Sequence, residues 1–133
     1  FENNFFDTII STECFEHDPE YKESLLKIYK MLKSDGLFIF TCASTGRKEH
    51  GTRRKSKKDS YGTIAKLDDM QDYYKNLTIE DINEVLRLDE LFSSWDSYYN
   101  SSSKDLYFIG IKKGEMIKKE LEKYNDKHCK NTK

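Results

Sequence analysis

Two short apolar runs on either side of an amphipathic segment constrain the fold of this chain more than any other sequence feature. Residues 5–11 read FFDTIIS and residues 37–43 read LFIFTCA. Nearly continuous runs of aromatic and β-branched residues are typical of parallel strands buried on both faces. Between them, apolar residues recur at the helical spacing i, i+3, i+4 and i+7: Leu25, Ile28, Tyr29 and Leu32. The pattern predicts one strand–helix–strand unit with a right-handed crossover.

Local signals predict where this helix begins and ends. Asp18 is well placed to cap it, and Pro19 suits the first helical position, where a missing N–H costs nothing. The stretch Ser34-Asp35-Gly36 predicts the end, because glycine readily adopts the left-handed conformation of a helix C-terminus. A helix is therefore expected between these two signals.

The second half of the chain predicts a long loop, a short helix and an antiparallel hairpin. Residues 44–60 are polar and longer than most loops of compact domains, which favours a functional lid or a mobile segment. Thr78 to Asp81 matches the S/T-x-x-D/E start of a helix. Residues 91–99 and 106–112 are strand-like and are joined by NSSSKD. Residues 115–124 predict a charged helix, followed by a frayed tail.

Composition narrows the class of protein. With 133 residues the chain suits one domain, residues 1–113, with a terminal helix and tail over 114–133. The formal net charge of −1 gives no global field toward nucleic acid or a membrane. No apolar stretch approaches the roughly 20 residues that span a bilayer. Three cysteines without metal-ligand spacing predict reduced thiols in a cytoplasmic protein and no metal site.

The chemistry is expected where the strands end. In open parallel sheets, ligands bind beyond the carboxyl ends of the strands. The acid-rich stretch 13–18 follows the first strand, and the polar segment 44–60 follows the second. Both are therefore expected to border one crevice, with Cys14 and Cys42 as small buried side chains at the strand ends.

Three segments in this order resemble a known family. The succession FDTIISTECFEH, LLKIYKMLKSDGLFIFTCA and a hairpin ending in LYFIGIKK resembles the second half of a Rossmann-like S-adenosylmethionine-dependent methyltransferase, type 11-like. The resemblance covers about residues 5–113 and implies an α/β fold. In it, a parallel strand–helix–strand unit, a helix and an antiparallel hairpin supply the fourth to seventh strands of a partial Rossmann-like sheet.

The resemblance also implies what this chain lacks. The family's glycine-rich turn after the first strand, and the acid that binds the cofactor ribose, have no counterpart in this sequence. The chain is therefore expected to be a C-terminal half, inactive alone, whose intact parent uses S-adenosylmethionine. The strand edge and apolar faces left without partners predict self-association.

Site residues follow from the resemblance, position by position. The residues next to the cofactor would be Ser11, Thr12 and Glu13. On the acceptor side, Glu16 and His17 would border the pocket, His17 or His50 would act as catalytic base, and Arg47 would hold an acceptor carboxylate or phosphate. The acceptor would be a small molecule or glycan.

Blander interpretations stay open for the same residues. Glu16 and His17 are also compatible with the start of a helix, and His50 with a solvated surface side chain. The basic run of residues 47–58 predicts a solvated loop more strongly than a phosphate clamp. The rival function is therefore a non-enzymatic module that binds nucleic acid or another anionic partner through residues 47–58. For the enzyme, nucleic acid is not expected as a partner.

Overall fold

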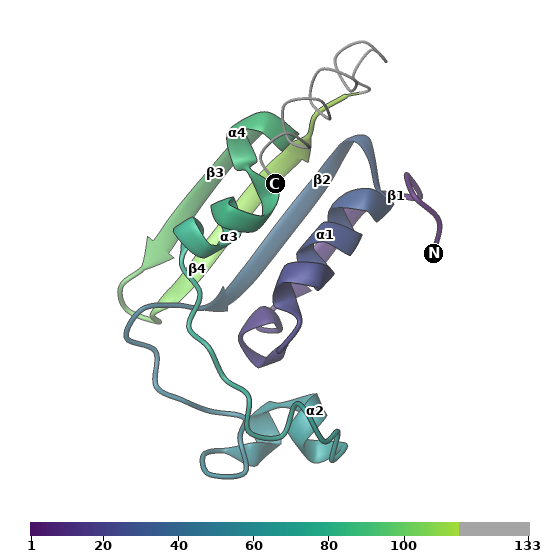
Figure 1. Ribbon diagram of the computed structural model, residues 1–133. Helices are drawn as coiled ribbons and strands as arrows, with labels where there is room; N and C mark the ends of the chain where they lie inside the picture. The colour runs from purple at the N-terminus through teal and green to yellow at the C-terminus, as the bar shows by residue number, and fades with distance from the viewer. Residues whose placement is uncertain (115–133) are drawn as a thin grey trace, which may run out of the picture.

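A four-stranded sheet with helices on one face forms the body of the protein in the computed structural model, which describes residues 1–114 (Figure 1). The strands, in their spatial order, are β1 (Phe6–Thr12), β2 (Leu32–Ala43), β4 (Asp105–Lys112) and β3 (Phe92–Asn100). β1 and β2 are parallel, whereas β4 is antiparallel to both β2 and β3. The predicted α/β class, with a parallel unit and a C-terminal hairpin, is confirmed.

The crossover helix α1 (Tyr21–Met31) is shorter than predicted at both ends. Asp18 lies before the helix, where its carboxylate accepts hydrogen bonds from the Glu20 N–H at 2.8 Å and the Ser24 hydroxyl at 2.5 Å. The helix ends at Met31 because β2 begins at the next residue. The predicted stop at Ser34-Asp35-Gly36 is therefore wrong.

That stop signal marks an irregularity in β2 instead. The pairing with β1 shifts register between Phe6 and Thr8, so the stretch before Leu37 bulges out of the ladder. Asp35, and not Gly36, has the left-handed φ of +61°. A Cβ at Gly36 would lie 2.7 Å from the Lys33 carbonyl oxygen, so the bulge requires glycine for close backbone contact.

The predicted start of the second helix is confirmed. Helix α3 (Ile79–Leu86) begins with a capping box, in which the Thr78 hydroxyl accepts from the Asp81 N–H and the Asp81 carboxylate accepts from the Thr78 N–H. Short helical turns that the sequence did not predict are η1 (Phe15–His17), η2 (Lys57–Asp59), α2 (Tyr61–Ile64) and α4 (Leu88–Leu91). The helix predicted over 115–124, the tail and Cys129 lie outside the described residues.

The core lies between the sheet and the helices. Phe38 and Phe40 on β2 and Phe108 on β4 are at most 2% exposed and pack together, with the Phe40 and Phe108 rings stacked. On the opposite face of the sheet, Ile10 is 63% exposed and Ile109 is 48% exposed. The prediction that the first strand is buried on both faces is wrong for the described residues, because helices cover only one face and β1 forms an edge of the sheet.

A long excursion connects β2 to α3 over residues 44–78 and lies beyond the carboxyl end of β2 (Figure 1). It is longer than the predicted loop of 44–60 and contains η2 and α2. Two backbone hydrogen bonds fix its end, both at 2.9 Å: the Leu77 N–H donates to the Ala43 carbonyl of β2, and the Lys75 N–H donates to the Glu16 carbonyl of η1 (Phe15–His17). In residues 1–114, no helix has the length and apolarity needed to cross a membrane.

Candidate functional site

The chain leaves β1 through the three residues predicted to lie next to the cofactor. Ser11 and Thr12 still pair with Phe40 and Thr41 of β2. Glu13 then donates its N–H to the Thr41 carbonyl at 2.8 Å and adopts a positive φ of 48°, which turns the chain away from the strand. Ser11 is half-buried, whereas Thr12 and Glu13 are exposed. The three residues therefore lie together at the carboxyl end of the strand.

Phe15 positions the next two residues. Its ring is 2% exposed and packs edge-on against Phe38 and Phe40, with centroids 6.4 and 5.3 Å away. Because Phe15 anchors the turn η1 in the core, Glu16 and His17 are drawn inside as well, at 0% and 5% exposure. Both residues lie before α1, which begins at Tyr21, so the interpretation that they start this helix is wrong.

His50 reaches the same place from the excursion. Its ring centroid lies 5.0 Å from that of His17, with the two rings nearly perpendicular at 85°. Gly51 permits this approach, since its φ is +68° and a Cβ there would lie 2.5 Å from His17 Cε1. The Tyr74 ring completes the wall, with its centroid 5.0 Å from that of His50 and 5.7 Å from that of His17.

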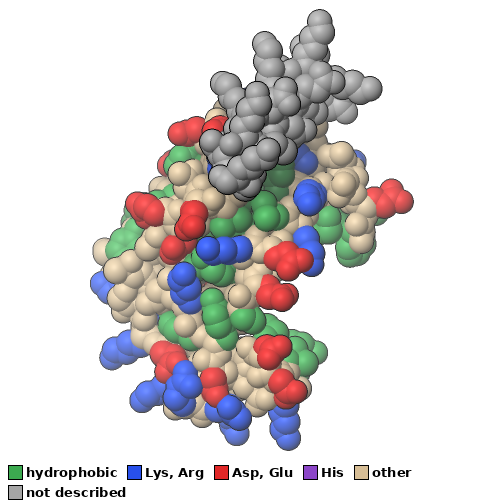
Figure 2. Space-filling model, viewed as in Figure 1, with side chains coloured by type: hydrophobic (Ala, Val, Ile, Leu, Met, Phe, Trp, Pro, Cys, Tyr) green, Lys and Arg blue, Asp and Glu red, His purple; other side chains and the backbone are tan. Residues whose placement is uncertain are grey.

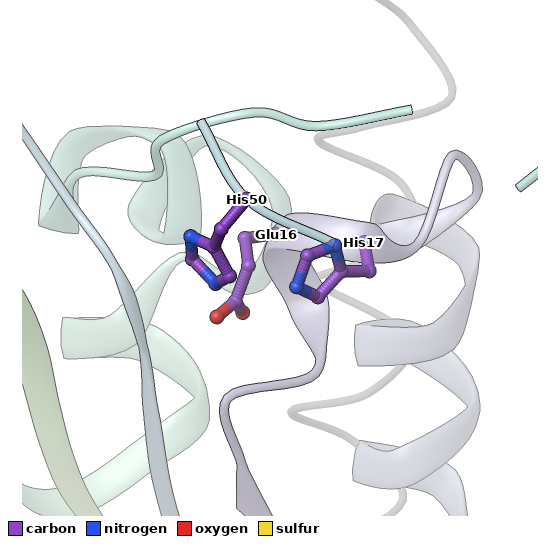
Figure 3. Close-up of side chains that lie close together, drawn as sticks. All are labelled: Glu16, His17 and His50. Atoms are coloured by element: carbon purple, nitrogen blue, oxygen red, sulfur yellow. The ribbon is translucent and has the colours of Figure 1, made fainter. Parts of the chain in front are cut away.

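Glu16, His17 and His50 form a compact polar cluster (Figure 3). One nitrogen or oxygen atom from each side chain lies within 4.8 Å of the others. Both carboxylate oxygens of Glu16 and both ring nitrogens of His17 are buried and have no hydrogen-bond partner among the described residues. Buried polar atoms are normally paired, so this cluster departs from ordinary packing.

Burial shifts the acid–base properties of the cluster. It raises the pKa of the Glu16 carboxyl to about 7, and the nearby Glu13 carboxylate adds to the shift. Burial likewise lowers the pKa of His17 to about 4, with His50 contributing by charge repulsion. At neutral pH, His17 is therefore an uncharged imidazole. The pKa of the Tyr74 hydroxyl is raised, mainly by burial and then by the Glu16 charge.

An open hollow of about 890 Å³ borders the cluster. Glu13 and His50 contribute to its wall, so the end of β1 and the cluster both face it. The remaining wall residues are all polar: Arg47, Lys48, Glu49, Lys55, Ser56 and Asp59. A pocket with both charges suits a polar ligand more than an apolar one.

Arg47 lines the hollow, and it also holds the loop to the sheet. Its guanidinium pairs with the buried Asp105 and donates to the Ser103 carbonyl at 3.0 Å. The Asn76 side chain in turn donates to the Arg47 carbonyl at 3.0 Å. Arg47 Nη1 makes both contacts, and a guanidinium has five N–H donors. Its predicted role in acceptor binding stays a prediction.

The basic run is partly neutralised inside the excursion. Arg53 pairs with Asp72, and Arg54 pairs with Glu49 and Asp72. In Figure 2, Lys and Arg side chains at this end of the molecule alternate with Asp and Glu. The surface there is mixed in charge and does not form a continuous basic face.

Several site features were absent from the sequence prediction. The contact between His17 and His50, the place of Tyr74 beside them and the need for Gly51 all depend on how the excursion folds back onto η1. A local sequence motif could not have indicated these contacts, because the residues involved are distant in sequence. For the thiols, Cys42 is buried as predicted, whereas Cys14 is exposed because it begins η1 with its side chain outside the core.

Comparisons with known proteins agree with the fold. The family model described as a methyltransferase domain matches residues 1–40. A search among curated proteins finds no match. Solved structures match at low identity. The CurJ carbon methyltransferase has a TM-score of 0.56 and 16% identity, over 86% of this chain and 31% of that one.

Two further structures show the range of the fold. The 1,6-didemethyltoxoflavin-N1-methyltransferase of Burkholderia thailandensis, solved with S-adenosylhomocysteine, has a TM-score of 0.51 and 19% identity over 85% of this chain and 46% of that one. The [4+2]-cyclase SpnF has a TM-score of 0.52 and 12% identity over 86% and 53%. The chain thus spans about a third to a half of these three structures.

The resemblance seen in the sequence is therefore confirmed: the chain has a partial Rossmann-like methyltransferase fold. Identities this low establish the fold alone, and the cyclase shows that one fold can carry another reaction.

Proposed function

We propose that this chain is the C-terminal half of an S-adenosylmethionine-dependent methyltransferase and is inactive alone. The observation that carries the proposal is the placement of the Glu16, His17 and His50 cluster beyond the carboxyl end of β1, beside a polar hollow, in a methyltransferase fold. The general activity is supported by the comparisons. The proposal adds that cofactor binding requires a preceding half as well as this chain.

On the cofactor side, Ser11, Thr12 and Glu13 would border the methionine end of S-adenosylmethionine. Their grouping where β1 ends, and the position of Glu13 on the hollow, support this role. The cofactor supplies an activated methyl group on a sulfonium. By the resemblance, the glycine turn and the ribose-binding acid belong upstream of residue 1, so these three residues would bind the cofactor only weakly without them.

On the acceptor side, the protein mainly holds two reactants in line and accepts a proton from a hydroxyl or amine. Glu16, His17 and His50 supply the groups that could take that proton. His50 reaches the hollow, whereas His17 lies behind it. The mixed charge of the hollow supports a polar small-molecule or glycan acceptor, with Arg47 offering spare donors to a carboxylate or phosphate.

The rival proposal is a binding module that uses residues 47–58. Its support is weaker, because Arg47, Arg53 and Arg54 already pair with acids of the same chain. A nucleic-acid clamp would lose affinity steeply as salt rises, through release of counterions. If fluorescence anisotropy detects DNA or RNA binding at low salt that weakens in this way, the module replaces the enzyme as our proposal.

The exposed edge and open face of the sheet support self-association. Ile10, Ile39 and Ile109 pair across three strands on the face without helices. An apolar surface of this kind is a template for pairing with a second chain. Light scattering should show oligomers that Ile10→Lys reduces and Leu26→Lys on α1 does not. A wild-type monomer at all concentrations would remove the proposal.

The two free thiols among the described residues suit the predicted cytoplasmic location.

The enzyme proposal is tested by titration calorimetry and activity. The chain alone should show no measurable heat with S-adenosylmethionine, whereas a longer protein with a methyltransferase N-terminal half should bind it. In that longer protein, His17→Ala should lower turnover by about 10²-fold to 10⁴-fold. Tyr61→Ser, at a side chain 79% exposed on α2, is the control. Micromolar cofactor binding by the isolated chain would contradict the requirement for a preceding half.

A further inference from the structure

The polar cluster poses a physical problem that the fold itself does not solve. Two carboxylate oxygens and two imidazole nitrogens are buried with no partner among the described residues. Such atoms lose their hydrogen bonds to water without replacement, at a cost of about 1–3 kcal/mol each in proteins. Nevertheless Glu16, His17 and His50 lie together, with one nitrogen or oxygen atom of each side chain within 4.8 Å of the others (Figure 3).

The donor set identifies what would satisfy these atoms. Zinc binds imidazole nitrogen and carboxylate oxygen at about 2.0–2.2 Å, which separates two ligands of a tetrahedral ion by roughly 3.4 Å. The ligand atoms of the cluster lie within 4.8 Å of one another, so small side-chain rotations can bring them to this separation. Two imidazoles among three ligands favour zinc, iron, cobalt or nickel over magnesium or calcium, which prefer oxygen.

The surroundings also have the features of a built site. His50 Nδ1 lies 3.1 Å from the Lys48 carbonyl oxygen. In the tautomer that makes this hydrogen bond, Nδ1–H donates to the carbonyl and Nε2 keeps a free lone pair, which is the usual arrangement of a metal-binding histidine. The backbone of Gly51 packs so closely on His17 that no side chain fits between them.

The main chain around Gly51 is fixed as well. Its N–H donates to the Ser56 carbonyl at 3.1 Å, and its carbonyl accepts a hydrogen bond from the Thr63 hydroxyl. These contacts fix the local conformation next to His50, and the hydrogen bond from the Lys75 N–H to the Glu16 carbonyl ties the excursion to η1. The two hydrogen bonds of Gly51 lie within the excursion. His50 therefore belongs to a segment whose local conformation is fixed by its own contacts.

We propose that Glu16, His17 and His50 bind one divalent transition-metal ion of the zinc type. Three protein ligands leave a coordination position open, which is typical of catalytic zinc sites. That position would face the hollow, because His50 forms part of its wall. The proposal goes beyond methyl transfer and does not rest on it. With the ion bound, the coordinating atoms would have no free lone pair for a proton, so the role of these side chains as catalytic base applies to the metal-free protein. It also reverses the sequence prediction of no metal site, because the third ligand is distant in sequence and completes no local motif.

Metal binding to the chelator-treated 133-residue chain tests the proposal. Zn²⁺ is titrated by calorimetry, and Co²⁺ by its visible absorption, which reports coordination by nitrogen and oxygen. One ion per chain is expected. The tail carries His128 and Cys129, which could also bind zinc. The reference protein is therefore the double variant His128→Ala, Cys129→Ser, which should still bind one ion.

Two substitutions in that reference protein locate the ion. His50→Ala removes a ligand from a half-buried loop position and should weaken zinc binding by about 100-fold or more. Glu16→Gln keeps the shape of the side chain and should weaken it similarly. Glu49→Gln, on the same hollow, is the matched control and should bind as the reference does. Circular dichroism confirms that each variant is folded.

Two results would overturn the proposal. One is a folded reference protein that binds no zinc or cobalt at micromolar concentration, which would leave ordered water as the partner of the buried atoms. The other is unchanged affinity in both His50→Ala and Glu16→Gln, which would place the ion elsewhere.

Discussion

Phe15 and the two residues after it are all buried, yet their surroundings differ completely. Phe15 joins an aromatic core in which rings contact rings. Glu16 and His17 enter an adjacent space in which their side-chain polar atoms have no hydrogen-bond partner among residues 1–114. Burial stabilises the first region and is costly in the second. Proteins keep such local conflicts mainly at functional sites, and the contrast therefore separates the part of this chain that makes the fold from the part that does chemistry.

Lys112 shows that polar burial alone is not the anomaly. Its ammonium group donates to the carbonyls of Tyr29 and Leu32 at 2.8 and 2.7 Å, near the end of α1, and to the Asn4 side chain at 3.3 Å. Burial lowers the pKa of this amine, yet its hydrogen bonds are satisfied. This fold can therefore supply hydrogen-bond partners to a buried charged group.

The largest expected effect is in the aromatic core. Phe40→Ala should lower the free energy of unfolding by about 3–5 kcal/mol, because it leaves a cavity among packed rings. Urea denaturation monitored by circular dichroism measures the loss. Leu26→Ala, at a side chain 43% exposed on α1, should change stability much less. Equal losses in the two variants would mean that the core assignment is wrong.

An intermediate effect is expected at the paired amine. Lys112→Met keeps most of the side-chain volume but removes the hydrogen bonds to the Tyr29 and Leu32 carbonyls, and should cost about 1–3 kcal/mol. The same denaturation experiment applies. A variant as stable as the wild type would show that these hydrogen bonds contribute little, and the contrast with the polar cluster would disappear.

The smallest effect, with the opposite sign, is expected in the cluster. In chelator-treated protein, Glu16→Gln removes a buried carboxylate that has no partner, and should raise the free energy of unfolding by up to about 1 kcal/mol. Thermal unfolding in the presence of a chelator measures it. A decrease of more than about 1 kcal/mol in the free energy of unfolding would indicate a structural partner for this carboxylate, and the contrast between the aromatic core and the polar cluster would be lost.

Local patterns explain which parts of the fold could be predicted. The apolar runs of β1 and β2, the capping box at Thr78 and the hairpin strands each depend on neighbouring residues, and each was found from the sequence. The end of α1 was missed because Gly36 serves a bulge contact instead of a helix stop.

The candidate site was only half predictable for the same reason. The stretch 13–18 was located because it follows a strand that ends at the ligand-binding edge, and the resemblance to the family singled out Glu16 and His17 within it. Their approach to His50 depends on the tertiary course of residues 44–78, which no periodicity encodes. The burial of β1 was overestimated because an apolar run does not reveal whether helices cover one face of a sheet or both.

The most direct test of the contrast compares the thermal stability of the wild type and Glu16→Gln with and without zinc, both in the His128→Ala, Cys129→Ser background. Without metal, Glu16→Gln should be the equal or more stable protein. With zinc at 100 times its dissociation constant for the wild-type site, binding adds about 2.7 kcal/mol to the wild type and much less to the variant, so their order should reverse. An order that is the same with and without zinc would contradict the account, because the buried carboxylate would then have no ligand to hold.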